Sequence, residues 1–196
     1  MPKIVDPESR RAEVADALFR LAAREGLHRV SLRTVAAEAA LNVGSVRHYF
    51  DNQAELMRFA MRSMIDRVAA RIRQRADELV AATGLSASER RERVVGLLGE
   101  LLPLDEKRRA EVTVFVEFVT AARTDPALTD LAREAAEGTR ALVRHVLQRS
   151  EVDDLELEVR RLIALLDGLS FDGVLHPEAL TPRQIEAVVR AHLARL

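Results

Sequence analysis

Residues 31–50 read SLRTVAAEA, ALN, VGSVRHYF: two short helix-forming segments separated by a break of three residues. Ser31 is a good N-cap for the first segment, and Asn42 for the second, residues 43–49. The first segment has apolar residues spaced for one helix face: Leu32, Val35, Ala36 and Ala39. Helices this short cannot bury a core alone and need another helix behind them. The stretch therefore predicts a helix-turn-helix unit.

A longer helix precedes this unit. Asp6 followed by Pro7 is typical of an N-cap with proline at the first helical position, and Gly26 is a typical helix stop. Apolar residues recur between them at helical spacing: Val14, Leu18, Leu21 and Ala22. Together with the two short helices, this helix completes a predicted three-helix head.

Helices are also expected over the rest of the chain. Asn52, with Glu55 three residues later, resembles a capping box and begins a long helix that ends near Gly84. Later helices are expected at 88–102, 105–123, 125–149, 154–175 and 181–196, with Pro103, Pro126, Pro177 and Pro182 at their boundaries. The fold class is all-α, with about nine helices. We expect one domain over residues 1–52 and a second over 53–196.

Composition excludes several classes of protein. The 196 residues contain no cysteine, which excludes disulfides, cysteine zinc sites and iron–sulfur ligation. There is no apolar run of membrane-spanning length, and the start MPKIVDPESRR has no apolar core of a signal peptide, so we expect a cytoplasmic protein. The net charge of −1 combines +5 in residues 1–75 with −6 in residues 76–196, so it does not exclude nucleic acid.

The second helix of the unit has the chemistry to enter a major groove. Its spacing turns Val46 and Phe50 inward and leaves Arg47 outward, where a guanidinium can donate two hydrogen bonds to guanine. Hydroxyls on Ser45 and Tyr49 suit phosphates; the alternative for Tyr49 is core packing, in which its hydroxyl would need a partner. Two further residues suit contact with DNA: Gly44 lets the backbone approach closely, and the Arg33 side chain can reach either a base edge or the DNA backbone. Taken singly, Arg33 and Arg47 are better interpreted as solvated surface residues, and it is the full motif that favours DNA contact.

Residues 10–59 resemble the N-terminal DNA-binding domain of the TetR family of transcriptional regulators. The matching text is RRAEVADALFRLAAREGLHRVSLRTVAAEAALNVGSVRHYFDNQAELMRF, about a quarter of the chain. The resemblance places the helix-turn-helix motif at residues 31–50. It implies DNA contacts at Arg33, Val43, Gly44, Ser45, Arg47, Tyr49 and Gln53. We add Asn42, the expected N-cap, and His48, for which a local hydrogen bond is an equal alternative.

Three positions depart from the family pattern. The turn usually has glycine where this chain has Ala40, and a left-handed backbone there would cost alanine roughly 1 kcal/mol. The recognition helix usually has an aromatic residue where this chain has Arg47. The fourth helix usually begins with a phosphate-binding lysine where this chain has Gln53, so the salt-dependent part of DNA binding should be weaker.

Residues 154–175 predict the quaternary structure. Residues in this segment follow a heptad spacing, and two apolar residues of the last helix join them. We predict that these residues form a dimer interface: Leu155, Val159, Leu162, Leu166, Leu169, Gly173, Ile185 and Val189. The alternative is a buried core helix in a monomer. The family resemblance favours the dimer, and residues 165–196 are similar to the C-terminal domain of the choline/betaine-repressor subgroup.

A small-molecule pocket is expected near residues 105–123. Apolar residues there accompany a polar stripe that includes Glu117, which could face a cationic or hydroxyl-bearing effector. The alternative is that the stripe is an ordinary solvent face. That alternative is favoured, because a glutamate is rarely buried without a partner. The predicted lining is Phe115, Glu117, Phe118 and Phe171. Residues 53–196 would then form a ligand-binding and dimerisation domain.

These features predict a homodimeric transcriptional regulator, a repressor that a small molecule releases from a pseudo-palindromic operator. We expect neither cofactor nor metal. The alternatives are a helical metal- or cofactor-dependent enzyme and an interaction module that does not bind DNA. Asp172 with His176, and Glu25 with His28, have half of a metal-site spacing each, but neither has a second ligand cluster nearby in sequence. The chain contains no HExxH, P-loop, GxGxxG or GxSxG motif.

Overall fold

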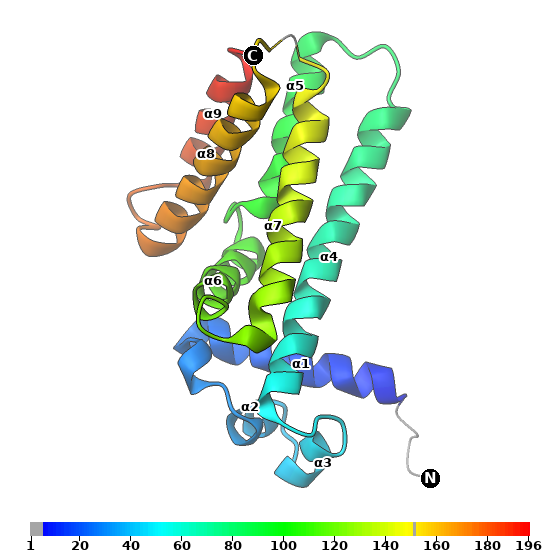
Figure 1. The fold of residues 1–196 in the computed structure, drawn as a ribbon, viewed down its shortest axis with the longest axis vertical. Helices are drawn as coiled ribbons and strands as arrows, with labels where there is room; N and C mark the ends of the chain where they lie inside the picture. Colours follow the sequence, from blue (N-terminus) through cyan, green and yellow to red (C-terminus); the bar gives the residue numbers. More distant parts are fainter. Residues whose placement is uncertain (1–5, 151) are drawn as a thin grey trace. The chain divides into compact units, whose positions relative to one another are not determined.

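A computed structural model of the chain describes residues 6–150 and 152–196 (Figure 1). These residues form nine α-helices and two short 3-10 helices, with no strand among them. The α-helices are α1 (Pro7–Glu25), α2 (Leu32–Glu38), α3 (Val43–Arg47), α4 (Gln53–Ala81), α5 (Ala87–Leu98), α6 (Glu106–Ala121), α7 (Pro126–Leu147), α8 (Leu155–Leu175) and α9 (Pro182–Leu193). The 3-10 helices are η1 (Leu27–Arg29) and η2 (Gly99–Leu101). The all-α prediction is confirmed.

The predicted N-caps of the first three helices are confirmed. The side chains of Asp6, Ser31 and Asn42 each accept a hydrogen bond from the backbone N–H three residues later, at 3.1, 3.1 and 2.7 Å. At the start of α4 only half of the expected capping box forms. Asn52 accepts from the Glu55 N–H at 2.9 Å, but the Glu55 carboxylate accepts from the N–H of Asp51 instead.

The turn between α2 and α3 contains a left-handed alanine. Ala40 has φ 55°, and it is the one non-glycine residue with positive φ in the described part of the chain. The Ala40 N–H donates to the Ala37 carbonyl at 3.1 Å, and the Leu41 N–H donates to the Ala36 carbonyl at 2.9 Å. This is the Schellman arrangement, which closes a helix and directs the chain into the next one.

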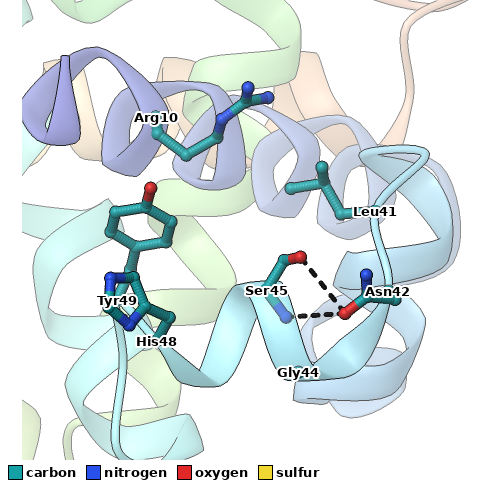
Figure 2. A pocket seen from close by; sticks show the side chains of 7 residues that line it. All are labelled: Arg10, Leu41, Asn42, Gly44, Ser45, His48 and Tyr49. Carbon is teal, nitrogen blue, oxygen red and sulfur yellow. Dashed lines mark hydrogen bonds between the residues drawn. The ribbon is translucent and has the colours of Figure 1, made fainter. Parts of the chain in front are cut away.

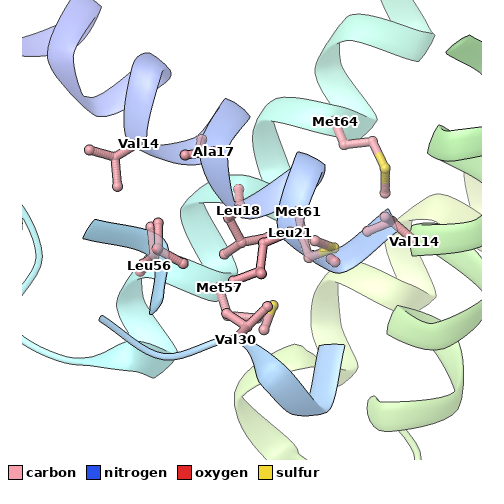
Figure 3. Close-up of a cluster of buried hydrophobic side chains, with 14 of the residues drawn as sticks. Val14, Ala17, Leu18, Leu21, Val30, Leu56, Met57, Met61, Met64 and Val114 are labelled. Carbon is pink, nitrogen blue, oxygen red and sulfur yellow. The ribbon is translucent and has the colours of Figure 1, made fainter. Parts of the chain in front are cut away.

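Contacts divide the chain into two compact units. The first contains the residues up to 66 together with 113–132, so it includes the beginning of α4, the end of α6 and the start of α7. Figure 3 shows the reason: side chains of α1, α4 and α6 belong to one buried hydrophobic cluster, among them Leu18, Leu21, Leu56, Met61 and Val114. The unit that holds the three-helix head therefore extends beyond the boundary expected at residue 52.

The second unit contains residues 67–112 and 133–196, and its core corrects the predicted dimer interface. The heptad seam of α8 lies inside this core: Val159, Leu162, Leu166 and Leu169 are buried, as are Gly173 and, on α9, Ile185 and Val189, while Leu155 is half-buried against the same cluster. A side chain that is buried within one protomer has no surface left to bury against another. The seam is therefore intramolecular, because α8 must cover α9 and the neighbouring helices.

The second unit also contains a buried carboxylate. Glu100 of η2 accepts hydrogen bonds from the guanidinium groups of Arg71 and Arg75 on α4, at 2.8 and 2.5 Å. Arg71 also holds Glu111 of α6 with two hydrogen bonds. Burial by itself would raise the pKa of Glu100, but the hydrogen bonds from Arg71 and Arg75, together with the charges of Arg75 and Arg108, hold that pKa below its usual value. Glu100 therefore stays ionised and ties η2 to α4.

Candidate nucleic-acid interface

A hollow of about 450 Å³ lies between α1 and α3 (Figure 2). Its lining comes from α1, from the α2–α3 turn, from α3 and from the two residues after it: Arg10, Leu41, Asn42, Gly44, Ser45, His48 and Tyr49. Five of these seven residues were predicted to contact DNA. The hollow therefore brings together, on one surface, most of the residues that the sequence assigned to one task.

The two sides of α3 differ as its spacing predicted. Val46 is fully buried, and Phe50, just after the helix, is almost so. On the other side Gly44, Arg47 and His48 are exposed. A helix of five residues has little stability of its own, so the buried pair fixes which side faces outward. Arg47 is thereby held on the outer side of the head.

Asn42 and Ser45 are already bonded to each other. The Asn42 side-chain oxygen accepts hydrogen bonds from the Ser45 N–H at 2.7 Å and from the Ser45 hydroxyl at 3.1 Å, as the dashed lines in Figure 2 show. The Ser45 hydroxyl would have to leave Asn42 before it could donate to a phosphate. In this arrangement the hydroxyl oxygen can only accept.

The remaining predicted contacts lie around this helix. Val43 and Tyr49 are half-buried, and Arg33 at the start of α2 and Gln53 at the start of α4 are exposed. The Tyr49 ring meets the His48 ring edge-on, with 5.1 Å between centroids and 78° between planes. Tyr49 thus packs in part and also lines the hollow.

Arg10 was not among the residues predicted to contact DNA, and the structure places it with them in the lining of the hollow. It lies in the first turn of α1 and lines the hollow, and its guanidinium donates to Glu13 at 2.6 Å. The sequence did contain a signal: Arg10 precedes Val14 by four residues and so continues the inward-facing stripe of α1 toward α3. An exposed ion pair of this kind contributes little to stability, so Arg10 can exchange Glu13 for another anion.

The predicted pocket residues are in different surroundings from those expected. The Glu117 carboxylate accepts a hydrogen bond from the Leu27 N–H of η1 at 2.5 Å, within the first unit. Phe118 is fully buried in the core of the same unit, where Phe115 packs against that core. Phe171 is 54% exposed on α8, in the second unit. The prediction is corrected for two of these residues: Glu117 bonds to η1 instead of facing an effector, and Phe118 is part of the core.

The features considered for an enzyme form local pairs. His176 and Asp172 are both exposed and 2.7 Å apart at the end of α8, and Glu25 pairs with Arg24 and Arg29. Over residues 6–150 and 152–196, no group of three or more metal-ligating side chains occurs. In the same residues, no helix is long and apolar enough to cross a membrane.

Comparison with known proteins matches both parts of the chain. A family model described as "Bacterial regulatory proteins, tetR family" matches residues 14–58, and one described as "BetI-type transcriptional repressor, C-terminal" matches residues 90–196. The HTH-type transcriptional regulator PksA of Bacillus subtilis (strain 168) is 32% identical, over 98% of this chain and 92% of that protein.

Solved structures agree with these matches. A transcriptional regulator from Rhodococcus sp. Rha1 superimposes with a TM-score of 0.82 at 29% identity, covering 97% of this chain and 95% of the other. The multidrug binding protein EbrR, solved in complex with imidazole, is 34% identical with a TM-score of 0.63, and the match covers 100% of this chain and 93% of EbrR.

Proposed function

This chain belongs to the TetR family of bacterial regulatory proteins: it is a DNA-binding transcriptional regulator and not an enzyme. We propose that it is a homodimeric repressor that a small molecule releases from its operator. The observation that carries the proposal is the outward side of α3. The helix carries the exposed Arg47 and is followed by the exposed His48, while Val46 and Phe50 on the inner side are buried. Its place of action is the cytoplasm, where the DNA is.

In the complex, α3 enters the major groove and Arg47 reads a base edge. The residues around it contact the backbone or neighbouring bases: Arg33, Asn42, Val43, Gly44, Ser45, His48, Tyr49 and Gln53. A guanidinium that donates to both O6 and N7 distinguishes guanine from the other bases. Two heads of a dimer would occupy half-sites about 34–36 Å apart, or a multiple of that distance.

The contact assignment is tested on a duplex that the wild-type protein selects from a random library. Arg47→Ala should weaken operator binding by about 1–3 kcal/mol and relax discrimination at one base position. Arg123→Ala is the matched control, because Arg123 is also an exposed arginine but follows α6 instead of lying on the head. Equal affinities for wild type and Arg47→Ala would remove Arg47 from base readout. Failure of the wild type to select any duplex would overturn the DNA-binding proposal.

The dimer uses the outer side of α8 and α9, not the buried seam. Large apolar side chains are exposed there on both helices: Leu157, Phe171, Leu175 and Val188. Nothing lies within 4 Å of a Cβ built on Gly168, so α8 offers a close approach at its centre. Exposed apolar residues on two adjacent helices suit a four-helix bundle across a two-fold axis.

Phe171→Glu tests this surface, because a charge in an apolar interface is costly to desolvate. The variant should be monomeric by light scattering at micromolar concentration, while the wild type is dimeric. Val80→Glu is the control, since Val80 is 64% exposed at the end of α4 and lies outside the proposed surface. A dimeric Phe171→Glu variant would contradict this placement of the interface, and a monomeric wild type would contradict the dimer itself.

Release by a small molecule requires that it bind the DNA-free protein more tightly than the operator complex. The relative EbrR has been solved with imidazole, so imidazole and larger nitrogen heterocycles are the first probes. Any probe that weakens operator affinity must itself be bound more weakly, by the same factor, when operator is present. Calorimetry with and without operator checks that equality, and unequal factors would show that the probe acts in some other way.

A further inference from the structure

Arg11 of α1 lies where the recognition helix ends and α4 begins. Its Nη1 donates a hydrogen bond to the Tyr49 carbonyl at 3.1 Å. Its Nη2 is 3.5 Å from one oxygen of Glu55, and the other oxygen of Glu55 accepts from the Asp51 N–H at 2.8 Å. One guanidinium therefore joins α1 to the turn that follows α3, directly at Tyr49 and through Glu55 at Asp51.

The same guanidinium is enclosed by two aromatic rings. Its central carbon lies 4.7 Å from the centroid of the Phe50 ring and 4.6 Å from that of Phe59. The two rings are 5.4 Å apart, centroid to centroid. The Nε of Arg11 is buried without a hydrogen-bond partner in the structure, which is a cost that a residue serving stability alone would avoid. The two ring faces offset part of that cost by cation–π attraction.

We propose that Arg11 is a positioning residue for DNA readout: it holds the C-terminal end of the recognition helix at a fixed angle on the head. The inference rests on the proposed function of α3. A five-residue helix leaves its last carbonyls without partners inside the helix. Arg11 bonds to the Tyr49 carbonyl in the turn just after the helix, and its charge is favourable near that end of the helix dipole.

The two ends of α3 are thereby fixed in different ways. Asn42 caps the start, and Val46 anchors the middle in the core. Beyond Val46 the chain reverses into α4 over residues 48–52, and Arg11 reaches across from α1 to that reversal. Releasing Arg11 leaves the helix formed but frees its outer end to tilt, which moves Arg47 relative to a base edge.

The test separates positioning from folding. Arg11→Met keeps an unbranched chain between the two rings but loses the hydrogen bond and the charge, and Arg11→Lys keeps the charge without the planar fork. For each variant the affinity is measured for the operator selected by the wild type and for a scrambled duplex of equal length, at one salt concentration. A variant that is only partly folded loses the same factor on both duplexes. A variant with a misplaced helix loses discrimination, because the scrambled duplex is bound through phosphates alone.

For Arg11→Met we expect the operator-to-scrambled ratio to fall by about tenfold or more, the worth of one base contact, and for Arg11→Lys a smaller fall. Ala22→Gly is the control: it weakens buried α1 without touching α3 and should leave the ratio unchanged. If Arg11→Met does not fold, hydrogen exchange of residues 48–51 in Arg11→Lys should rise relative to α2. A retained ratio, or unchanged exchange, overturns the inference while leaving the proposed function intact. Absence of selective binding by the wild type overturns both.

Discussion

Replacing Ala40 by glycine should make the protein more stable. Ala40 ends the Schellman turn with φ 55°, a conformation that crowds an L-residue's Cβ against the following carbonyl. The Ala40 methyl is exposed, so its removal costs little packing. The two backbone hydrogen bonds of the turn, from Ala40 and Leu41, use atoms that glycine also has. Only the strain and the freedom of the unfolded chain change.

The magnitude follows from those two contributions. Left-handed backbone costs an L-residue about 1–2 kcal/mol, and glycine avoids that cost. Glycine loses more freedom on folding, by about 0.5–1 kcal/mol relative to alanine. The expected gain is therefore about 0.5–1 kcal/mol, or about 0.3–0.5 M in the urea midpoint for an m-value near 2 kcal/mol/M.

Tyr49 makes the measurement local. It is the single tyrosine of a chain without tryptophan, and it follows α3 directly, so its fluorescence reports on the head during urea unfolding. Ala37→Gly is the matched control: Ala37 is also exposed, but it lies inside α2, so there the substitution should destabilise by about 1 kcal/mol. The reasoning is refuted if Ala40→Gly lowers the midpoint, or if both substitutions shift it equally.

Three more substitutions test the electrostatics and packing. The hydrogen bond from Arg58 holds the pKa of Asp130 well below its usual value, so Asp130→Asn should be less stable than wild type at pH 7. The difference in urea midpoint between the two proteins should narrow as the pH falls below about 4, because Asp130 then becomes protonated in the unfolded wild type. A difference independent of pH would contradict this. Glu100→Gln should cost about 2 kcal/mol by urea unfolding followed by circular dichroism, because it removes a buried partner of two arginines; a loss below about 0.5 kcal/mol would show that the ion pairs contribute little. Gly173→Ala should lower the melting temperature, since its Cβ would lie 2.9 Å from Pro103; an unchanged value would mean that the ring moves freely.

Local signals in the sequence predicted the elements well. Capping residues and prolines located the helix boundaries to within a few residues, because a cap acts on its own neighbours. The inward pair Val46 and Phe50 followed from spacing alone. The family pattern, with glycine where this chain has Ala40, raised a left-handed backbone there as a condition, and the structure has it. Each of these inferences depended on atoms only a few residues apart.

Spacing did not reveal which partner covers an apolar stripe. The heptad seam of α8 has the period of a dimer interface, but in the structure Leu162 and Leu166 are covered by the protomer's own helices. Glu117 is separated from Leu27 by 90 residues, so nothing local could predict their hydrogen bond. No local pattern in the sequence distinguishes Arg11 from a surface arginine, because its contacts with Tyr49, Phe50 and Phe59 are made by residues far along the chain.

The makeup of the first compact unit limits how this protein can be recombined. A chimaera made by joining residues 1–52 to another regulator would leave behind Met61 and Phe118, which fill the core behind the recognition helix, and Glu117, which holds η1. The transplanted segment would carry the proposed DNA-contacting residues but would lack part of the hydrophobic core that supports them. An exchange that aims to change operator choice alone should graft only the outward residues of α3, leaving α1, α4 and α6 native.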